Sequence, residues 1–223
     1  MNAPLSLHEA YDRWAEVYPA EPHNPLMQGE QAAMLELLPP LSGCQVLDLA
    51  CGSGRYVAIA QAAGAAFVVG VDYSQAMLGH ARFAARVRAD MARLPLRANS
   101  FGVVISGLAL GHALDLDNCV AGIARVLRPG GVLVYSDFHD EAWRSGLTRS
   151  FKDASGNGVM LPPDGYPPAM HRAALTAAGF EVQQMQELRV GIEFTLEFAN
   201  SAEFYRRYHG VPLLLVARAR KRP

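Results

Sequence analysis

Short apolar runs alternate with segments of helical periodicity through the middle of the chain. The runs predict strands over residues 46–49, 67–71, 87–89, 101–106 and 132–136. Helices are expected between them, over residues 54–63, after the capping residue Ser74, and from Asp117 to Leu127. Strands that alternate with helices in this way form a parallel sheet with right-handed crossovers and helices on both faces.

The two ends of the chain have different patterns. Residues 1–40 predict helical pieces that are interrupted by a proline-containing loop and stopped by Pro39 and Pro40. Residues 140–168 are polar and rich in glycine and proline, which is typical of a long loop that is either disordered or functional. Beyond this loop we expect a helix over 169–178, a strand over 180–188, a short helix over 202–208 and a last strand over 212–219.

The composition indicates one globular domain. The chain has 223 residues, of which 51% are hydrophobic, enough for one sizeable core but not for two. Twenty Lys and Arg against twenty-one Asp and Glu leave a net charge of -1, so nucleic acid is not an expected partner. Cys44, Cys51 and Cys119 form neither a CxxC pair nor a cluster with histidine, so neither a disulfide framework nor a metal site is expected.

Targeting signals are also not evident in the sequence. The first residues lack a basic segment followed by an apolar stretch, and no apolar run approaches the roughly 20 residues that cross a bilayer. We therefore expect a soluble cytoplasmic protein without a membrane partner. The sequence does not indicate an oligomeric state.

The chemistry is concentrated where the first strand meets the following helix, in the segment Asp48-Leu49-Ala50-Cys51-Gly52-Ser53-Gly54. Gly52 and Gly54 allow the backbone to approach a ligand, and the start of the helix offers unpaired N–H groups. Asp72 ends the second strand about 20 residues on, where an open α/β sheet places an acidic residue to bind the two hydroxyls of a ribose. Asp48 stands near where a diphosphate would lie, so it favours a ligand with cationic groups over a dinucleotide.

Four motifs in this order resemble the class I S-adenosylmethionine-dependent methyltransferases, particularly the small-molecule branch typified by the ubiquinone and menaquinone C-methyltransferases. The motifs are the segment 48–54, then Gly70-Val71-Asp72-Tyr73-Ser74 with Met77-Leu78, then Ala89-Asp90-Met91 with Leu94-Pro95, and Leu127-Arg128-Pro129-Gly130-Gly131. Ala50 departs from the family, which usually has glycine at this position.

The resemblance implies an α/β fold: a Rossmann-like doubly wound sheet, mostly parallel with an antiparallel last strand, helices on both faces and an N-terminal helical lid. We expect one domain over residues 1–223, divided into the lid (1–40), a cofactor-binding core (41–140), and a substrate-side loop with C-terminal strands (141–223).

The implied cofactor is S-adenosyl-L-methionine. The turn backbone would line its methionine part with Asp48 near the amino group, Asp72 would bind the ribose, and Asp90 with the backbone of Met91 would hold the adenine edge. The residues expected to bind the cofactor are Tyr11, Asp48, Ala50, Cys51, Gly52, Gly54, Asp72, Tyr73, Met77, Asp90, Met91, Ser106 and Gly107.

Two histidines follow strands at the carboxyl edge of the sheet, where open α/β folds bind ligands: His112 after the fourth strand and His139 after the fifth. Each is a candidate catalytic base or hydrogen-bonding residue for the acceptor, because histidine titrates near neutral pH. Asp137 would flank His139 if the strand continued that far. In the polar loop, Arg144 and Arg149 either bind a substrate carboxylate or are simply solvated.

The leading hypothesis is an enzyme that methylates a small molecule on oxygen, either a hydroxyl or a carboxylate, by in-line methyl transfer. The chain reads Ser106-Gly107-Leu108-Ala109 where exocyclic-amine methyltransferases carry Asn/Asp-Pro-Pro-Tyr, so methylation of such amines is disfavoured. Two alternatives stay open. The first is an enzyme that uses the same cofactor for cyclisation, lyase chemistry or other alkyl transfer, and the second is a non-catalytic cofactor-binding domain.

Overall fold

The computed structural model describes residues 5–19, 21–162, 165–194 and 201–223. Small parts of the expected lid (1–4 and 20) and of the expected substrate-side region (163–164 and 195–200) lie outside the described residues.

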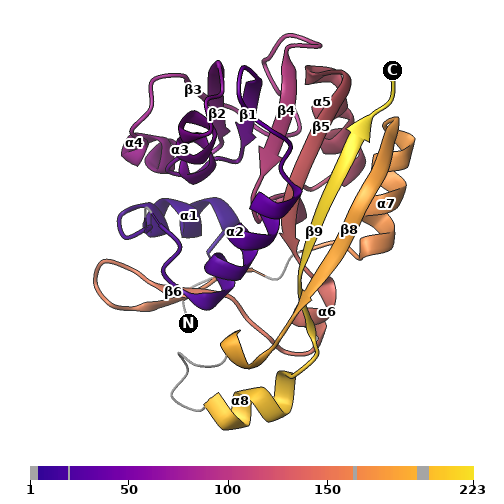
Figure 1. Cartoon of the computed structure of the whole chain (residues 1–223). Coiled ribbons are helices and arrows are strands. Elements are labelled where there is room, and N and C mark those ends of the chain that lie inside the picture. Colours follow the sequence, from indigo (N-terminus) through magenta and orange to yellow (C-terminus); the bar gives the residue numbers. More distant parts are fainter. Residues whose placement is uncertain (1–4, 20, 163–164, 195–200) are drawn as a thin grey trace.

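A seven-stranded sheet in the order β3-β2-β1-β4-β5-β9-β8 forms the centre of the molecule (Figure 1). Its strands are β1 (Gln45–Leu49), β2 (Phe67–Asp72), β3 (Arg86–Arg88), β4 (Phe101–Ser106), β5 (Leu127–Phe138), β8 (Phe180–Arg189) and β9 (Pro212–Lys221). Strand β9 runs antiparallel to both β5 and β8, while the other neighbours pair in parallel. The expected doubly wound sheet with an antiparallel last strand is therefore confirmed.

Helices cover both faces of the sheet (Figure 1). On one face, α5 (Leu116–Val126) and α7 (Pro168–Ala177) pack over the strands, and on the other lie α2 (Pro25–Leu37) and α3 (Arg55–Ala62). The alternation of strand side chains explains this division, because successive residues point to opposite faces. Leu47 belongs to the α5–α7 side, whereas its neighbour Val46 belongs to the α2–α3 side.

The helix boundaries follow the capping residues. Ser74 caps α4 (Gln75–His80), as expected, by accepting a hydrogen bond from the Met77 amide. Helix α5 begins earlier than expected, because Asp115 rather than Asp117 is its cap and accepts a hydrogen bond from the amide of Asn118. Asp117 lies inside the first turn, where its negative charge favours the helix N-terminus.

The N-terminal region divides into two helices with different environments. Helix α1 (Leu7–Ala15) begins with a capping box between Ser6 and Glu9. The sequence pattern placed Pro25 in a loop. Helix α2 instead begins at this residue, because Asn24 caps the helix and proline is well tolerated at its first position. Met34 and Leu37 of α2 are buried in the main core, so α2 is a core helix and α1 alone lies beyond the edge of the sheet.

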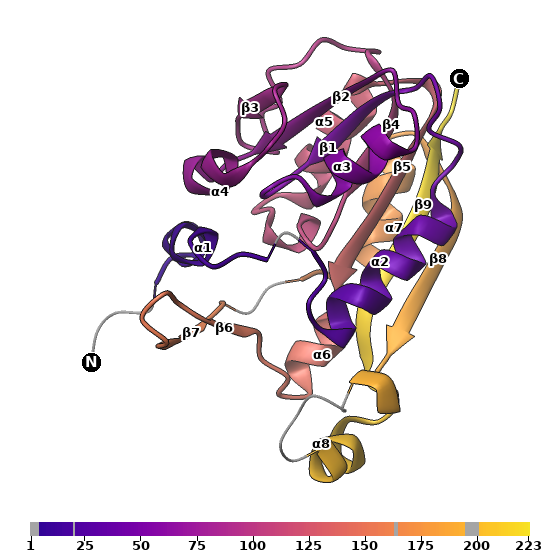
Figure 2. The same ribbon diagram turned by 60° about the vertical axis from the view of Figure 1, so that its left-hand side comes forward.

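The polar region after β5 contains regular structure. It forms α6 (Asp140–Arg144) and a hairpin of β6 (Ser150–Lys152) and β7 (Gly158–Met160). The hairpin lies beside α1 (Figure 2), and the two share a small apolar cluster separate from the main core. We call α1 and this hairpin together the two-part lid.

Three short helices complete the carboxyl edge: η1 (Leu110–His112), η2 (Ile192–Phe194) and α8 (Ser201–Tyr208). Within the described parts of the chain, no helix combines the length and the apolar composition that a bilayer crossing requires.

Candidate functional site

A cavity of about 1550 Å³ lies at the carboxyl edge of the sheet. The residues that follow β1, β2, β4 and β5 form its floor, and the two-part lid and α6 form its walls. This edge is where parallel α/β sheets bind ligands, since the loops that leave neighbouring strands converge there.

Asp72 at the end of β2 joins this edge to the glycine turn after β1. Its Oδ2 accepts a hydrogen bond from the amide of Gly52 at 2.7 Å, and its Oδ1 accepts one from the amide of Ser74 at 2.8 Å. Burial raises the pKa of the Asp72 carboxyl, and the backbone hydrogen bonds oppose that rise. Each carboxylate oxygen has a second lone pair, so Asp72 can accept two further hydroxyl donors while it holds the turn.

The glycine turn contains three left-handed residues. Ala50 has φ 57°, Gly52 has φ 55° and Gly54 has φ 101°. Ala50 therefore has a conformation that costs a residue with a Cβ atom roughly 1–2 kcal/mol, which explains why glycine suits this position in the resembled family. A Cβ atom on Gly52 would meet nothing within 4 Å, so the Cα of this residue borders open space at the cavity.

Gly54 has a different environment from Gly52. A Cβ atom at Gly54 would lie 2.4 Å from the ring of Phe83, and one at Gly70 would meet the same ring at the same distance. Gly54 is not among the residues that line the cavity. Its small size makes room for an aromatic side chain of the protein.

Asp48 is buried under the turn, with 1% of its surface exposed. Its Oδ2 accepts a hydrogen bond from the amide of Val57 in the first turn of α3, at 3.0 Å. Burial raises the pKa of Asp48 to about 8, although Arg55 and the Val57 amide favour the charged form. A cationic group in the cavity would favour the ionised carboxylate.

Four expected adenine-side residues line the same end of the cavity: Tyr73, Met77, Asp90 and Met91. Met77 is fully buried, whereas Tyr73 is half exposed and presents its ring to solvent and the cavity. Asp90 accepts a hydrogen bond from the amide of Ala92 through Oδ1, so it also caps the turn after β3. Its second oxygen is available to a ligand amine.

The exit of β4 brings Gly107 and Leu108 to the cavity, while Ser106 is fully buried outside its lining. A Cβ atom on Gly107 would lie 2.6 Å from the ring of Tyr56 and 3.2 Å from Oε1 of Glu30. Glycine is therefore required here for close packing against protein side chains.

Glu30 of α2 is a buried carboxylate that sequence reasoning missed. Its Oε2 pairs with Nη2 of Arg55 at 2.7 Å, and its Oε1 accepts hydrogen bonds from Tyr56 Oη at 2.8 Å and Ser136 Oγ at 2.6 Å. Arg55 also lies over the Tyr56 ring, 4.5 Å from its centroid. The available signal was a glutamate in the apolar stripe of α2, between Met27 and Met34, because buried glutamate is rare unless it is paired.

Helix α1 is attached to the cofactor-side edge by side-chain contacts. Tyr11 Oη hydrogen-bonds to Nε2 of His112 at 2.8 Å, and Ser74 Oγ donates to Asp12 at 2.7 Å. His8 contacts the edge of the Tyr73 ring with centroids 4.7 Å apart. Tyr11 and His112 both line the cavity.

A second residue missed by sequence reasoning is Tyr18, which follows α1 and lines the cavity. Its ring packs edge-on against Trp14, with centroids 4.9 Å apart. Burial raises the pKa of Tyr18, so its phenol stays a hydrogen-bond donor at neutral pH.

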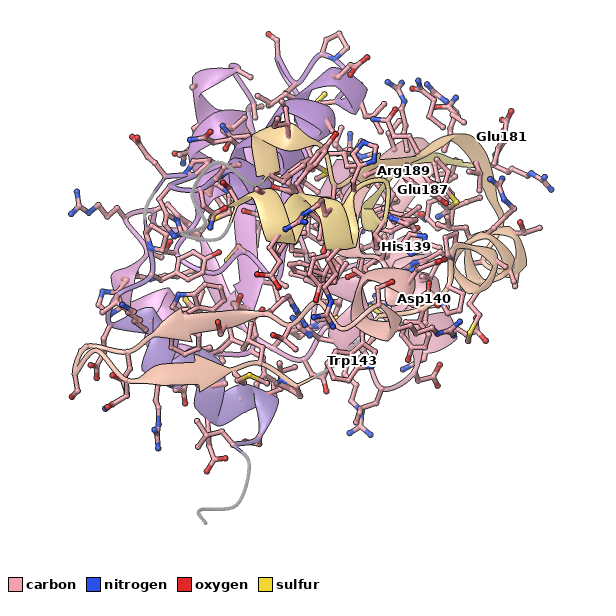
Figure 3. The ribbon with its side chains drawn as sticks, turned by 90° about the horizontal axis from the view of Figure 1, so that it is seen from below. His139, Asp140, Trp143, Glu181, Glu187 and Arg189 are labelled. Atoms are coloured by element: carbon pink, nitrogen blue, oxygen red, sulfur yellow. The ribbon has the colours of Figure 1, made fainter. Side chains whose placement is uncertain are left out.

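His139 lies where β5 gives way to α6, and its side chain is 5% exposed. Its Nδ1 accepts a hydrogen bond from the amide of Glu141 at 3.1 Å and so caps α6, and it lies 3.3 Å from Oδ1 of Asp140. Its Nε2 lies 3.5 Å from Oε1 of Glu187, which in turn pairs with Arg189 (Figure 3).

The strand does not extend to His139, so the expected period-two alignment ends at Phe138. Asp137 lies beside His171 of α7, with Oδ2 and Nε2 3.5 Å apart. Burial lowers the pKa of His171 to about 4.

The comparisons with known proteins agree with this geometry. Residues 47–135 match the model of a protein family described as a methyltransferase domain. Over 134 residues the chain is 34% identical to the malonyl-[acyl-carrier protein] O-methyltransferase of Pectobacterium atrosepticum, a match that covers 58% of this chain and 49% of that protein. It is 37% identical over 98 residues to the demethylmenaquinone methyltransferase of Mycobacterium marinum, covering 43% of this chain and 42% of that protein. The chain thus spans about half the length of these curated relatives.

A solved structure matches over a larger part of the fold. The S-adenosylmethionine-dependent methyltransferase from Mesorhizobium loti superimposes with a TM-score of 0.69 at 25% identity, covering 86% of this chain and 97% of that one. The two proteins therefore share one fold. Residues 47–135 thus match a methyltransferase domain, and the fold of the chain is similar to that of an S-adenosylmethionine-dependent methyltransferase.

Proposed function

We propose that this protein is an enzyme that binds S-adenosylmethionine at the carboxyl edge of its sheet and methylates an oxygen atom of a small molecule. The observation that carries the proposal is the position of Asp72, whose carboxylate holds the glycine turn and borders the cavity at the same time. A carboxylate so placed can accept both hydroxyls of a ribose and align the rest of a nucleoside with the turn.

The residues of the cavity fit the remaining parts of this cofactor. The open space beside the Cα of Gly52 suits the methionine part, and the buried Asp48 favours its cationic end. Tyr73 and Met77 offer apolar surface to an adenine ring, with Asp90 and the backbone of Met91 at its edge. When bound, the cofactor supplies an electrophilic methyl group.

The task of the protein is then to align the acceptor and to exclude water. The cavity is larger than the roughly 300–1,000 Å³ of common small-molecule sites, which supports the binding of a second small molecule beside the cofactor. The lid helix α1 lies over the cofactor end, where Tyr11 and Asp12 fasten it. Its closure would exclude water from the reacting groups.

We propose acceptor-side roles for His112 and His139. His112 lies beside the exit of β4 and would orient the acceptor together with Tyr11. His139 uses Nδ1 to cap α6 and turns Nε2 toward Glu187, an arrangement that suits a positioning residue better than a base. The choice of oxygen as the acceptor atom is supported by the name of the Pectobacterium relative, whereas the Mycobacterium relative is named for a quinone substrate.

Calorimetry with purified protein tests the proposal. S-adenosylmethionine and S-adenosylhomocysteine should both bind with one site per chain, and NAD⁺ should bind more weakly than either. Tighter binding of NAD⁺ would contradict the assignment. During turnover the nucleoside product should be S-adenosylhomocysteine, and methylthioadenosine would indicate the alternative alkyl-transfer or cyclisation chemistry.

A further inference from the structure

The cavity has two ends that are lined by different side chains. Asp48, Asp72 and Asp90 line it from β1, β2 and the turn after β3, which lie at one end of the strand order. Strands β5, β9 and β8 lie at the other end of that order, with α6 and α8 below them (Figure 1). There the cavity is lined by a group of largely apolar side chains, Phe138, Ala142, Val190, Phe194, Tyr208 and Leu213. We call the part of the cavity that these six residues line the apolar chamber.

The wall of the apolar chamber is part of the packed interior. Five of its six residues are less than a tenth exposed, and Phe138 is partly buried and packs against them. The faces that they leave toward the cavity are mostly hydrocarbon. An apolar ligand that covers such faces releases water from them, which favours binding.

A charged ligand would gain little from this wall. Arg149 is a cation beside it and lies over the ring of Phe138, 4.1 Å from the ring centroid. One of its N–H groups reaches the carbonyl of Pro162 at 3.5 Å, so the guanidinium is already engaged with the protein. Burial of a charge against apolar side chains is costly unless a partner offsets it. The chamber therefore favours an uncharged molecule.

Leu108 lies between the two ends of the cavity, at the exit of β4. It lines the cavity and packs against the cluster that forms the chamber. Its φ is 55°, a left-handed conformation that residues with a Cβ atom rarely adopt. Its amide donates hydrogen bonds to the carbonyl oxygen and to Oγ of Ser136, both at 3.0 Å, and that hydroxyl donates to Oε1 of Glu30 at 2.6 Å. The buried Glu30 network thus holds the backbone of Leu108 in place.

The identity of this residue is informative. Glycine or asparagine would adopt the left-handed conformation more easily than leucine does. Strained residues persist where the surrounding structure enforces them, and they are concentrated at ligand sites. A role of the Leu108 side chain in contact with a ligand explains why an apolar residue stands at this position.

We propose that the methyl acceptor is a hydrophobic molecule with an uncharged body, that the apolar chamber binds this body, and that Leu108 contacts it beside the cofactor. This inference rests on the proposed function and narrows it to acceptors of low polarity.

Binding to the protein saturated with S-adenosylhomocysteine tests this without knowledge of the natural acceptor. Two neutral probes, phenylphenol and decanol, are compared by calorimetry with hydroxybiphenyl carboxylate and ω-hydroxydecanoate. These partners have the same body and hydroxyl, with a carboxylate added at the opposite end. We expect at least one neutral probe to bind at least about tenfold more tightly than its charged partner.

Two variants test the residues of the site. Asparagine tolerates the left-handed conformation, so Leu108→Asn should keep the backbone while it replaces an apolar side chain by a polar one. Val190→Thr adds a hydroxyl to the wall at nearly constant volume. Each variant should lower the affinity for the neutral probe at least about fivefold, with folding checked by thermal melts. Leu35→Asn, at an exposed position of α2 outside the cavity, should preserve that affinity.

Three results would overturn the inference. They are equal or tighter binding of the charged probes, the absence of binding by both neutral probes, and wild-type affinity for the neutral probe in either Leu108→Asn or Val190→Thr. These failures are distinct from failure of the proposed function, which would appear earlier as an absence of S-adenosylhomocysteine binding.

Discussion

Trp14 of α1 and Phe151 of β6 stack face to face, with ring centroids 4.8 Å apart and ring planes inclined by 8°. The stack joins the two parts of the lid, helix α1 and the β6–β7 hairpin. Movements of the two parts of the lid are therefore expected to be coupled.

Replacement of Trp14 by alanine tests this coupling. Aromatic stacking contributes about 0.5–1.5 kcal/mol beyond the burial of area, so Trp14→Ala should speed the release of S-adenosylhomocysteine roughly 2- to 10-fold. Stopped-flow measurement of the dissociation rate checks this. Phe67→Ala, which removes an exposed ring at the start of β2, is the control. A release rate equal to that of wild type would show that the stack does not hold the lid.

Asp72→Asn should weaken the binding of S-adenosylmethionine at least tenfold, about 1.4 kcal/mol. The change removes the negative charge that is proposed to bind the ribose hydroxyls, and it weakens the hydrogen bond that Asp72 accepts from the Gly52 amide. Calorimetry gives the affinity, and Asp117→Asn, an exposed acidic residue of α5 outside the cavity, provides the same charge change as a control. An affinity in Asp72→Asn that matches the control would remove the ribose assignment.

Glu30→Ala should lower the free energy of unfolding by about 3–5 kcal/mol, because Arg55 would lose its buried carboxylate partner. Glu36→Ala removes an exposed glutamate from the same helix and should have little effect. Urea denaturation measures the free energy of unfolding of both variants. Should Glu30→Ala not fold, Glu30→Gln keeps acceptors for Tyr56 and Ser136 and should be intermediate. Equal stability of the Glu30 and Glu36 variants would contradict the role of the network.

The raised pKa of Asp48 predicts a pH dependence with a definite sign. In the folded protein this carboxyl keeps its proton up to about pH 8, whereas its ordinary pKa is 3.8. Since the native state then binds more protons than the unfolded state, the contribution of Asp48 to stability falls as pH rises between these values. Thermal melts across this pH range should show that the melting temperature of wild type declines as pH rises. The decline should be smaller in Asp48→Asn.

The same carboxyl should release a proton when a cationic ligand binds near it. Calorimetric titration with S-adenosylmethionine at pH 7, in two buffers of different ionisation enthalpy, counts the protons released. Wild type should release more than Asp48→Asn, which also corrects for protons lost by the ligand itself. Identical counts would show that Asp48 does not respond to the ligand.

The sequence pattern predicted the sheet well because buried parallel strands are continuous apolar runs with few alternatives. The ends of β2 and β4 lie within a residue of their expected positions, and Ser74 caps its helix as expected. The start of α5 was less certain from sequence, because Asp115 and Asp117 are both good caps and only the backbone conformation distinguishes them.

The site was harder to predict than the fold. The glycine turn and Asp72 follow from a local motif, so both were found. Glu30 was missed because its partners Arg55, Tyr56 and Ser136 are distant in sequence and meet only after the helices pack. Gly54 belongs to a matching motif and Ser106 stands at the end of β4, yet neither lines the cavity, because tertiary packing decides which groups face a ligand.

A crystal structure with S-adenosylhomocysteine tests the central claim most directly. The proposed site predicts electron density for the nucleoside across the ends of β1 and β2, with both ribose hydroxyls within hydrogen-bond distance of Asp72 and the sulfur atom directed into the cavity. Density for the ligand elsewhere on the protein, or a ribose that does not contact Asp72, would contradict the site described here.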